Sequence, residues 1–254
     1  MTGKSRLDVL LVERGLAESR EKARALILAG AVLVEGRPAP KAGALVPADA
    51  SVEVAAGAQY VSRGGEKLAG ALAAFRLDVT GFVAIDVGAS TGGFTDCLLR
   101  NGAARVYAID VGYGLIDYRL RQDARVSVLE RVNIRYLESL PEKGDIATID
   151  VSFISLERVM PAVMRLLKAR GRVVALVKPQ FEAKRREVGK RGVVRDPQVH
   201  AAVLGRHVAW GAGQGLRLLG LTTSPLLGPA GNKEFFVLWR LPEASPEGDH
   251  GCGR

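Results

Sequence analysis

Apolar positions along this chain follow two different periods, and the change between them divides the chain in two. At the start, helical patterns are followed by short alternating runs, which predicts a small α+β unit. From residue 60 onward, short apolar runs alternate with helical stretches, the pattern of strand–helix–strand units. We expect a small α+β domain at 1–58 ending in an alanine- and glycine-rich stretch, a linker at 59–62, a larger domain at 63–242 and a disordered tail at 243–254.

The small unit begins with two predicted helices. Three leucines share one face of the first helix, and Asp8 lies away from that face. Ser19 is a typical N-terminal cap for the second helix, which Gly30 ends. Alternating apolar residues in 31–37 and 51–54 then predict strands.

The larger part carries seven apolar, branched runs that predict strands. The predicted strands are 82–87, 105–110, 126–129, 146–150, 172–178, 218–222 and 235–239. Helical stretches separate the first five, for example 156–168. Such alternation favours an α/β fold with a doubly wound, Rossmann-like parallel sheet. The last two runs lack a clear crossover between them, which predicts an antiparallel hairpin at the sheet edge.

Composition and charge narrow the class of protein. The chain has 254 residues, of which 48% are hydrophobic, enough for one buried core and a smaller second one. No apolar run reaches the roughly 20 residues of a membrane span, and no signal peptide is visible, so we expect a cytoplasmic protein without stable membrane association. A net charge of +9 favours a polyanionic partner such as nucleic acid. Two cysteines without nearby ligands favour neither a disulfide framework nor a metal site, and Cys97 is expected in the core.

A glycine-rich loop follows the first predicted strand of the larger part and opens a helix. Such a turn lets the backbone approach a ligand closely, and a carboxylate ending the next strand can accept both hydroxyls of a ribose. The loop lacks the GxGxxG spacing of dinucleotide sites, and Asp86 at its start would repel a pyrophosphate but suits the ammonium of a methionine moiety. The candidate cofactor-binding residues are Asp86, Gly88, Ala89, Ser90, Gly92, Asp110 and Asp150.

The same loop also matches GxSxG, the nucleophile elbow of serine hydrolases. That chemistry needs a histidine later in the chain. His200 and His207 fall seven residues apart on a predicted helix, and His250 lies in the tail. Helical histidines of this kind are more often surface or satisfied core residues, so the hydrolase reading is the weaker one.

Ionisable residues end two neighbouring strands beside the loop. Asp150 follows the fourth predicted strand, and Lys178 ends the fifth, where Pro179 stops it. A lysine that finishes a buried apolar run is costly unless it is paired. Lys67, just before a helix that leads to the first strand, and Glu234, at the start of the last strand, are further candidates.

The first part of the chain resembles the small RNA-binding domain of ribosomal protein S-four and of many pseudouridine synthases. The likeness is carried by Arg6-Leu7-Asp8, Leu11, Arg14-Gly15, Ser19-Arg20, Ala23, Leu26-Ile27, Gly30, Val32-Leu33-Val34 and Gly36. The resemblance implies that the basic second helix docks on folded RNA, mostly through phosphates and shape. The RNA-contacting candidates are Arg6, Arg14, Arg20, Lys22, Arg24 and Arg63, and we expect the basic stretch 184–195 to grip phosphates near the site.

Nearly the full chain, from Arg6 to Trp239, resembles the TlyA family, ribosomal RNA 2′-O-methyltransferases with an FtsJ-like catalytic domain. The matching stretches are 61–65, 88–95, 110–114, 150–156, 177–182 and 224–229. The resemblance implies S-adenosylmethionine as cofactor, ribosomal RNA or ribosomal subunits as partner, a cytidine ribose as target and a catalytic tetrad of Lys67, Asp150, Lys178 and Glu234. The resemblance leaves the small subunit, the large subunit or both open as targets, and because the chain stops soon after Trp239 the large subunit alone is favoured.

The chemistry explains why such a tetrad is useful. A ribose hydroxyl is a poor nucleophile, so it must be aligned with the methyl group and lose its proton as the bond forms. By hypothesis Lys178 orients and deprotonates the hydroxyl, Lys67 favours the neutral form of Lys178 or stabilises the developing oxyanion, and the two carboxylates hold the lysines. The alternatives are a non-catalytic RNA-binding ribosome-assembly factor and, because this family is often labelled haemolysin, a membrane-active protein. The sequence does not indicate an oligomeric state.

Overall fold

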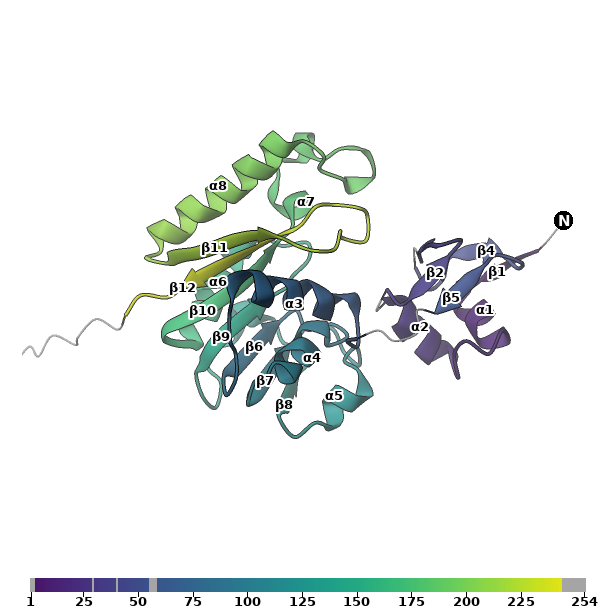
Figure 1. Ribbon diagram of the computed structural model, residues 1–254, viewed down its shortest axis with the longest axis horizontal. Helices are drawn as coiled ribbons and strands as arrows, with labels where there is room; N and C mark the ends of the chain where they lie inside the picture. The colour runs from purple at the N-terminus through teal and green to yellow at the C-terminus, as the bar shows by residue number, and fades with distance from the viewer. Residues whose placement is uncertain (1–2, 29, 40, 55–58, 244–254) are drawn as a thin grey trace, which may run out of the picture.

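A computed structural model describes residues 3–28, 30–39, 41–54 and 59–243. It contains a small unit of helices and short strands, and a larger one built around a single sheet (Figure 1). The expected stretch 55–58 before the linker, and all of the expected tail except Glu243, lie outside the described residues.

The small unit packs two helices against short antiparallel strands. The helices are α1 (Leu7–Glu13) and α2 (Arg20–Leu28), and the strands are β1 (Lys4–Arg6), β2 (Val32–Val34), β3 (Arg37–Pro38), β4 (Leu45–Pro47) and β5 (Val52–Val54). Strand β2 lies between β3 and β5, while β1 pairs with β4. Ser19 caps α2, since its hydroxyl accepts a hydrogen bond from the Lys22 amide at 3.1 Å. The cap is confirmed, but β1 and β4 were not predicted, because Lys4–Arg6 contains no apolar residue and Leu45–Pro47 ends in a proline.

Asp8 differs from the expectation that it lies away from the apolar face. Its side chain is fully buried and is held in two ion pairs, with Arg6 at 2.8 Å and Arg20 at 3.4 Å. The hydrogen bond from Arg6 is the main reason that the pKa of Asp8 falls to about 2, against the opposing effect of burial. A charge can therefore occupy this core position because two guanidinium groups cover it.

The larger unit is built on a seven-stranded sheet. Its strands are β6 (Val83–Val87), β7 (Arg105–Ile109), β8 (Val126–Leu129), β9 (Gly144–Ile149), β10 (Leu167–Val177), β11 (Arg217–Thr223) and β12 (Phe235–Arg240). Their order is β11-β12-β10-β9-β6-β7-β8. The pairs among β6 to β10 are parallel, while β12 is antiparallel to both β10 and β11. The doubly wound parallel sheet and the antiparallel pair are confirmed, with β11 at the edge and β12 one place inside it.

Helices cover both faces of this sheet (Figure 1). They are α3 (Arg63–Phe75), α4 (Gly93–Arg100), α5 (Tyr118–Gln122), α6 (Met160–Arg165), α7 (Pro179–Glu182) and α8 (Pro197–Gly213). Alternate residues of the strands enter two separate cores, as the period of a strand requires. Leu176 and Ala84 pack with Leu68 of α3, whereas Ala175 packs with Val203 of α8. Short 3-10 helices complete the unit at Ile134–Tyr136, Leu156–Arg158, Arg185–Glu187 and Lys190–Gly192.

Two predictions about local structure were wrong. The helix expected at 156–168 is instead a 3-10 turn followed by the short α6, and Leu167 already belongs to β10. Pro161 has no amide hydrogen and is tolerated in a first helical turn, so the helix restarts there instead of continuing. Lys67 lies inside α3 and not before it, because α3 begins at Arg63.

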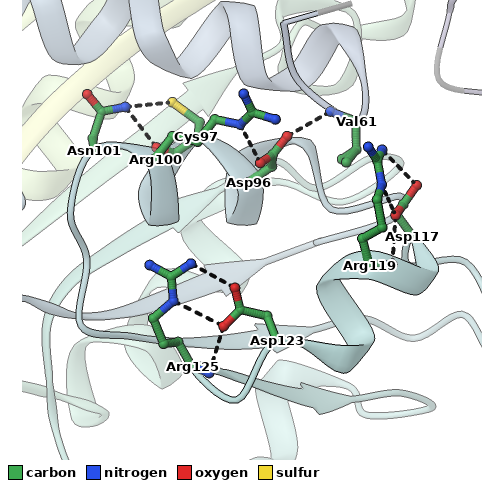
Figure 2. A network of polar contacts seen from close by, with 9 residues as sticks. All are labelled: Val61, Asp96, Cys97, Arg100, Asn101, Asp117, Arg119, Asp123 and Arg125. Carbon is green, nitrogen blue, oxygen red and sulfur yellow. Dashed lines mark hydrogen bonds and ion pairs between the residues drawn. The ribbon is translucent and has the colours of Figure 1, made fainter.

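Polar contacts fix how the chain enters the larger unit (Figure 2). Asp96 on α4 accepts hydrogen bonds from the Val61 amide at 2.9 Å and from Arg100 at 2.7 Å. Figure 2 also shows the side chain of Asn101 donating to the backbone carbonyl of Cys97. Cys97 is fully buried, as predicted, and burial is the main cause that raises the pKa of its thiol to about 12. The segment that leads into α3 is thus tied to α4.

Candidate active site

The carboxyl edge of the parallel strands gathers the polar residues that the sequence singled out. Strand β10 pairs with β12 up to Val177 and Phe235, so the next residue on each side places Lys178 opposite Glu234. Asp150 follows β9, the neighbour of β10 on its other side. Because β12 runs antiparallel, its beginning lies where the parallel strands end. Three residues from distant parts of the chain therefore form one row.

These residues and Lys67 form two ion pairs. Lys67 Nζ lies 2.6 Å from Glu234 Oε2, and both side chains are buried, with 10% and 1% of their surface exposed. Lys178 Nζ lies 2.5 Å from Asp150 Oδ1. The side chains of this second pair are 12% and 23% exposed, so it is the more open of the two. The structure brings all four proposed catalytic residues into pairs of opposite charge, although Lys67 and Glu234 are 167 positions apart.

Two further residues contact the pairs and were not found from the sequence. Lys178 Nζ donates a hydrogen bond to Ser152 Oγ at 3.0 Å. Gln180 Nε2 donates to Glu234 Oε1 at 3.5 Å, while its own Oε1 is buried and lacks a hydrogen-bond partner among the described residues. The sequence offered one signal for them. Ser152 lies two residues after Asp150 and Gln180 two residues after Lys178, so both follow a strand that ends at the same edge of the sheet.

The glycine loop approaches Asp150 closely. Gly88 has a φ of +85°, and a Cβ atom there would collide with the Asp150 carbonyl oxygen. The Asp150 amide donates to Val87 O at 2.9 Å, which holds the two strand ends together. Gly92, at φ +91°, is the N-cap residue of α4, and a side chain there would meet Leu120. The backbone at these positions requires glycine, as the loop motif implies.

Asp86 lies on β6, two residues before Gly88 of the glycine loop. The carboxyl group is fully buried, accepting hydrogen bonds from Thr95 at 2.7 Å and Thr148 at 3.1 Å. Burial is the main cause that raises its pKa to about 7, although both hydroxyls oppose the shift. Direct contact between Asp86 and an ammonium group stays a prediction, since the described contacts of its two oxygens are internal.

Asp110 lies at the end of β7, beside the loop. Its Oδ2 accepts a hydrogen bond from the Ser90 amide at 2.8 Å, and its Oδ1 accepts one from the Gly112 amide at 2.7 Å. Ala89 is buried next to Gly88 and donates its amide to Ile109 O, whereas Ser90 is exposed at a φ of +49°. Each carboxylate oxygen of Asp110 keeps a lone pair for a further donor.

Of the two expected alternatives, surface or satisfied core residues, the two described histidines are satisfied core residues. His200 contacts Val194 O at 3.0 Å, and His207 pairs with Glu182 at 3.4 Å. Both lie on α8, and neither contacts Ser90 among the described interactions. His250 lies outside the described residues. The Ser–His arrangement of a hydrolase is therefore not formed by the described histidines.

The predicted RNA-contacting residues of the small unit fall into three groups. Arg6 and Arg20 are half exposed around Asp8. Arg14 donates to Ala50 O at 2.7 Å and to Ala48 O at 2.6 Å, so its guanidinium group joins α1 to the loop before β5. Lys22 and Arg24 are exposed on α2.

Near the two ion pairs, Arg63 and the basic stretch 184–195 are held by backbone contacts. Arg63 donates to Leu227 O at 3.2 Å. The buried side chain of Asn232 accepts from the Val194 amide and donates to Gly192 O, both at 2.9 Å. The end of the basic stretch is thus fixed to the loop that precedes Glu234.

Two negative findings concern the described residues alone. None of their helices has the length and apolar character needed to cross a membrane. They also hold no group of three or more His, Cys, Asp or Glu side chains arranged for a metal ion.

Comparison with known proteins identifies the class to which this fold and site belong. Residues 60–241 match the FtsJ-like methyltransferase family, and residues 5–52 match the S4 domain. The chain therefore belongs to the FtsJ-like methyltransferases and carries an S4 domain before the catalytic one. The resemblance drawn from the sequence is confirmed.

Individual relatives place the chain among the TlyA proteins. YqxC of Bacillus subtilis is 49% identical over 252 residues, which cover 96% of this chain and 89% of YqxC. The 16S/23S rRNA (cytidine-2′-O)-methyltransferase TlyA of Mycobacterium tuberculosis is 45% identical over 243 residues, which cover 94% and 90% of the two chains. The solved structure of a hemolysin-named protein from Streptococcus thermophilus aligns with a TM-score of 0.75 at 42% identity, covering 96% of this chain and 90% of that one.

Proposed function

We propose that this protein transfers a methyl group from S-adenosylmethionine to the 2′-hydroxyl of a cytidine in ribosomal RNA, in the cytoplasm. The observation that supports this proposal most directly is the position of Glu234, Lys178 and Asp150 side by side next to the glycine loop. Lys178 pairs with Asp150, and Lys67 pairs with Glu234. The cytidine and the ribosomal RNA follow the name of the 45% identical TlyA relative. The domain boundaries given above, 1–58 and 63–242, are part of this proposal.

Lys178 is the residue we assign to the acceptor hydroxyl. An ammonium group has three N–H donors; Lys178 Nζ donates one to Ser152 Oγ and faces Asp150 in an ion pair, although Asp150 Oδ1 forms no hydrogen bond among the described residues. The remaining direction serves the ribose hydroxyl, which Lys178 orients and whose proton its neutral form accepts. Positioning of this kind contributes several kcal/mol to catalysis.

Lys67 supplies the second positive charge. Glu234 neutralises it in the buried pair, and Gln180 holds the other oxygen of Glu234. Lys67 would stabilise the oxyanion as the hydroxyl proton leaves, in a site where low solvent access strengthens charge interactions. The two carboxylates keep the lysines in place.

The loop and Asp110 fit S-adenosylmethionine. The lone pairs left on the Asp110 carboxylate suit two ribose hydroxyls, and the glycine backbone permits close approach of a ligand. When bound there, S-adenosylmethionine supplies an electrophilic methyl group. We assign cofactor contacts to Asp86, Gly88, Ala89, Ser90, Gly92, Asp110 and Asp150.

The RNA is held by the S4 domain and by basic residues near the pairs. Exposed Lys22 and Arg24 on α2, and Arg6 and Arg20 around Asp8, present charge to phosphates. Arg63 and the stretch 184–195 extend this charge toward Lys178. Arg14 remains a candidate, although its described contacts stabilise the domain itself.

A methyl-transfer assay with mapped products tests the proposal. Purified protein is incubated with labelled S-adenosylmethionine and separate small and large ribosomal subunits lacking the modification, and 2′-O-methyl groups are mapped on the RNA. Lys178→Ala should lose at least about 100-fold in rate. Lys168→Ala is the matched control, because Lys168 and Asp145 form a 2.7 Å pair from the same two strands, and this variant should retain the rate.

The same assay separates the alternatives. An assembly factor would bind subunits without labelling either of them, and normal methylation by folded Lys178→Ala would refute the assignment of the proton acceptor. A parallel vesicle-leakage measurement addresses the hemolysin name of the structural relative, and we expect no leakage.

A further inference from the structure

Two segments after neighbouring strands carry the pair Lys178–Asp150. One is the loop 150–156 after β9, and the other is α7 after β10. Besides the ion pair, they are joined where the rings of Phe153 and Phe181 lie 4.9 Å apart, and where the Leu156 amide donates to Glu182 Oε1 at 2.8 Å. Glu182 thus joins the two segments at the ends that lie farther along the chain from Lys178 and Asp150.

Glu182 also connects these segments to α8. Its second oxygen, Oε2, lies 3.4 Å from Nε2 of His207, and both side chains are 7% exposed. Its backbone carbonyl accepts a hydrogen bond from Arg206 at 3.1 Å. One buried carboxylate therefore joins the loop after β9, the short helix after β10 and the long helix that covers this face of the sheet.

The carboxylate is held in its charged form. Burial opposes ionisation, but hydrogen bonds from His207 and from the Leu156 amide outweigh it and keep the pKa of Glu182 below its ordinary value. Charged acceptors form the stronger hydrogen bonds, so the contacts of Glu182 with the Leu156 amide and with His207 resist separation.

Neither segment can hold its shape alone. Helix α7 has four residues, too few to be stable through its own hydrogen bonds. Phe153 has a φ of +64°, which a bulky side chain adopts only when its surroundings impose it. Both segments need contacts outside themselves, and Glu182, the last residue of α7, provides them by binding the Leu156 amide of the loop and His207 of α8.

We propose that Glu182, supported by His207, is a positioning residue that sets the geometry of Lys178 and Asp150 for methyl transfer. The proposal rests on the function proposed above, since it assumes that this pair handles the acceptor hydroxyl. Glu182 acts through the backbone of loop 150–156 and of α7, without touching the RNA.

The test compares Glu182→Ala, Glu182→Gln and Val203→Ala with the unchanged protein. Glutamine keeps an acceptor for the Leu156 amide, whereas alanine removes it. Val203 is a fully buried residue of α8, so Val203→Ala lowers stability while keeping the side chains of Glu182 and His207. For each protein, kcat and KM for ribosomal subunits, the affinity for S-adenosylmethionine and the free energy of unfolding are measured.

We expect Glu182→Ala to lower kcat by about 10- to 100-fold, because displacement of about 1 Å can have such an effect. KM and cofactor affinity should stay within about threefold, since the proposal gives the buried Glu182 no contact with either ligand. Glu182→Gln should recover most of kcat, and Val203→Ala should keep it despite lower stability.

Equal loss of kcat in Val203→Ala and Glu182→Ala at equal stability would reduce Glu182 to a merely structural role and overturn the proposal. So would an unchanged kcat in Glu182→Ala while Lys178→Ala is inactive. If the unchanged protein does not methylate ribosomal RNA at all, the proposed function itself fails, and the two failures are thereby distinguished.

Discussion

The buried ion pair between Lys67 and Glu234 allows a quantitative prediction of the free energy of unfolding. The Nζ to Oε2 distance is 2.6 Å, and solvent reaches 10% of one side chain and 1% of the other. Removing one partner leaves the other charge buried without compensation, which costs about 3–5 kcal/mol. Replacing both by apolar residues of similar size removes the charge altogether and is often neutral or stabilising. The single variants Lys67→Met and Glu234→Leu should therefore each lose about 3–5 kcal/mol of unfolding free energy, and the double variant should recover most of it.

Urea unfolding followed by tryptophan fluorescence measures this effect in the right domain, because both tryptophans of the chain, Trp210 and Trp239, lie in the larger unit. Each single variant should also melt roughly 6–20 °C lower, at about 2–4 °C per kcal/mol for a domain of this size. The double variant should be stable and yet inactive, which separates the structural from the catalytic contribution of the pair. Single variants within about 1 kcal/mol of the unchanged protein, or a double variant as unstable as the singles, would refute the reasoning.

Three further predictions concern the loop, the buried aspartate and the basic stretch. The folded-state pKa of Asp86, about 7, lies above its ordinary value of 3.8, so the stability that this group contributes is present at low pH and is lost as the pH rises between these values. Asp86→Asn should therefore gain stability relative to the unchanged protein between about pH 4 and pH 7 in urea unfolding, and a constant difference would contradict the raised pKa. Gly88→Ala should weaken S-adenosylmethionine binding at least about 10-fold in calorimetry, because its Cβ displaces the Asp150 carbonyl, whereas Gly205→Ala, where a Cβ meets open space, should bind normally. Arg185→Gln should reduce the slope of log K for ribosomal RNA against log salt concentration by about 0.7–0.9, and an unchanged slope would show that this exposed arginine makes no phosphate contact.

The amino-acid sequence by itself determined the type of fold and half of the candidate site. Strand–helix alternation predicted the parallel sheet, and the glycine loop followed its first strand as expected. Asp150 and Lys178 could be placed because the carboxyl ends of parallel strands meet at one edge. Local patterns were sufficient here, since period, caps and turns depend on residues close together in the chain.

Other features were decided only by the tertiary structure. Glu234 meets Lys67 across 167 positions because β12 runs antiparallel beside β10 and α3 packs on this face of the sheet, which no local period reveals. The burial of Asp8 and the contacts of Arg14 depend on partners brought in by folding, so residue type alone suggested solvent or RNA.

The same reason explains why the contact between Glu182 and His207 escaped the sequence analysis. Each looks like an ordinary polar residue on a helix, and only packing of α8 against the segment after β10 brings them together. The sequence identified the residues at which chemistry is expected, while the three-dimensional structure decided which neighbours hold them, because long-range contacts depend on strand order and on the helices that cover each face.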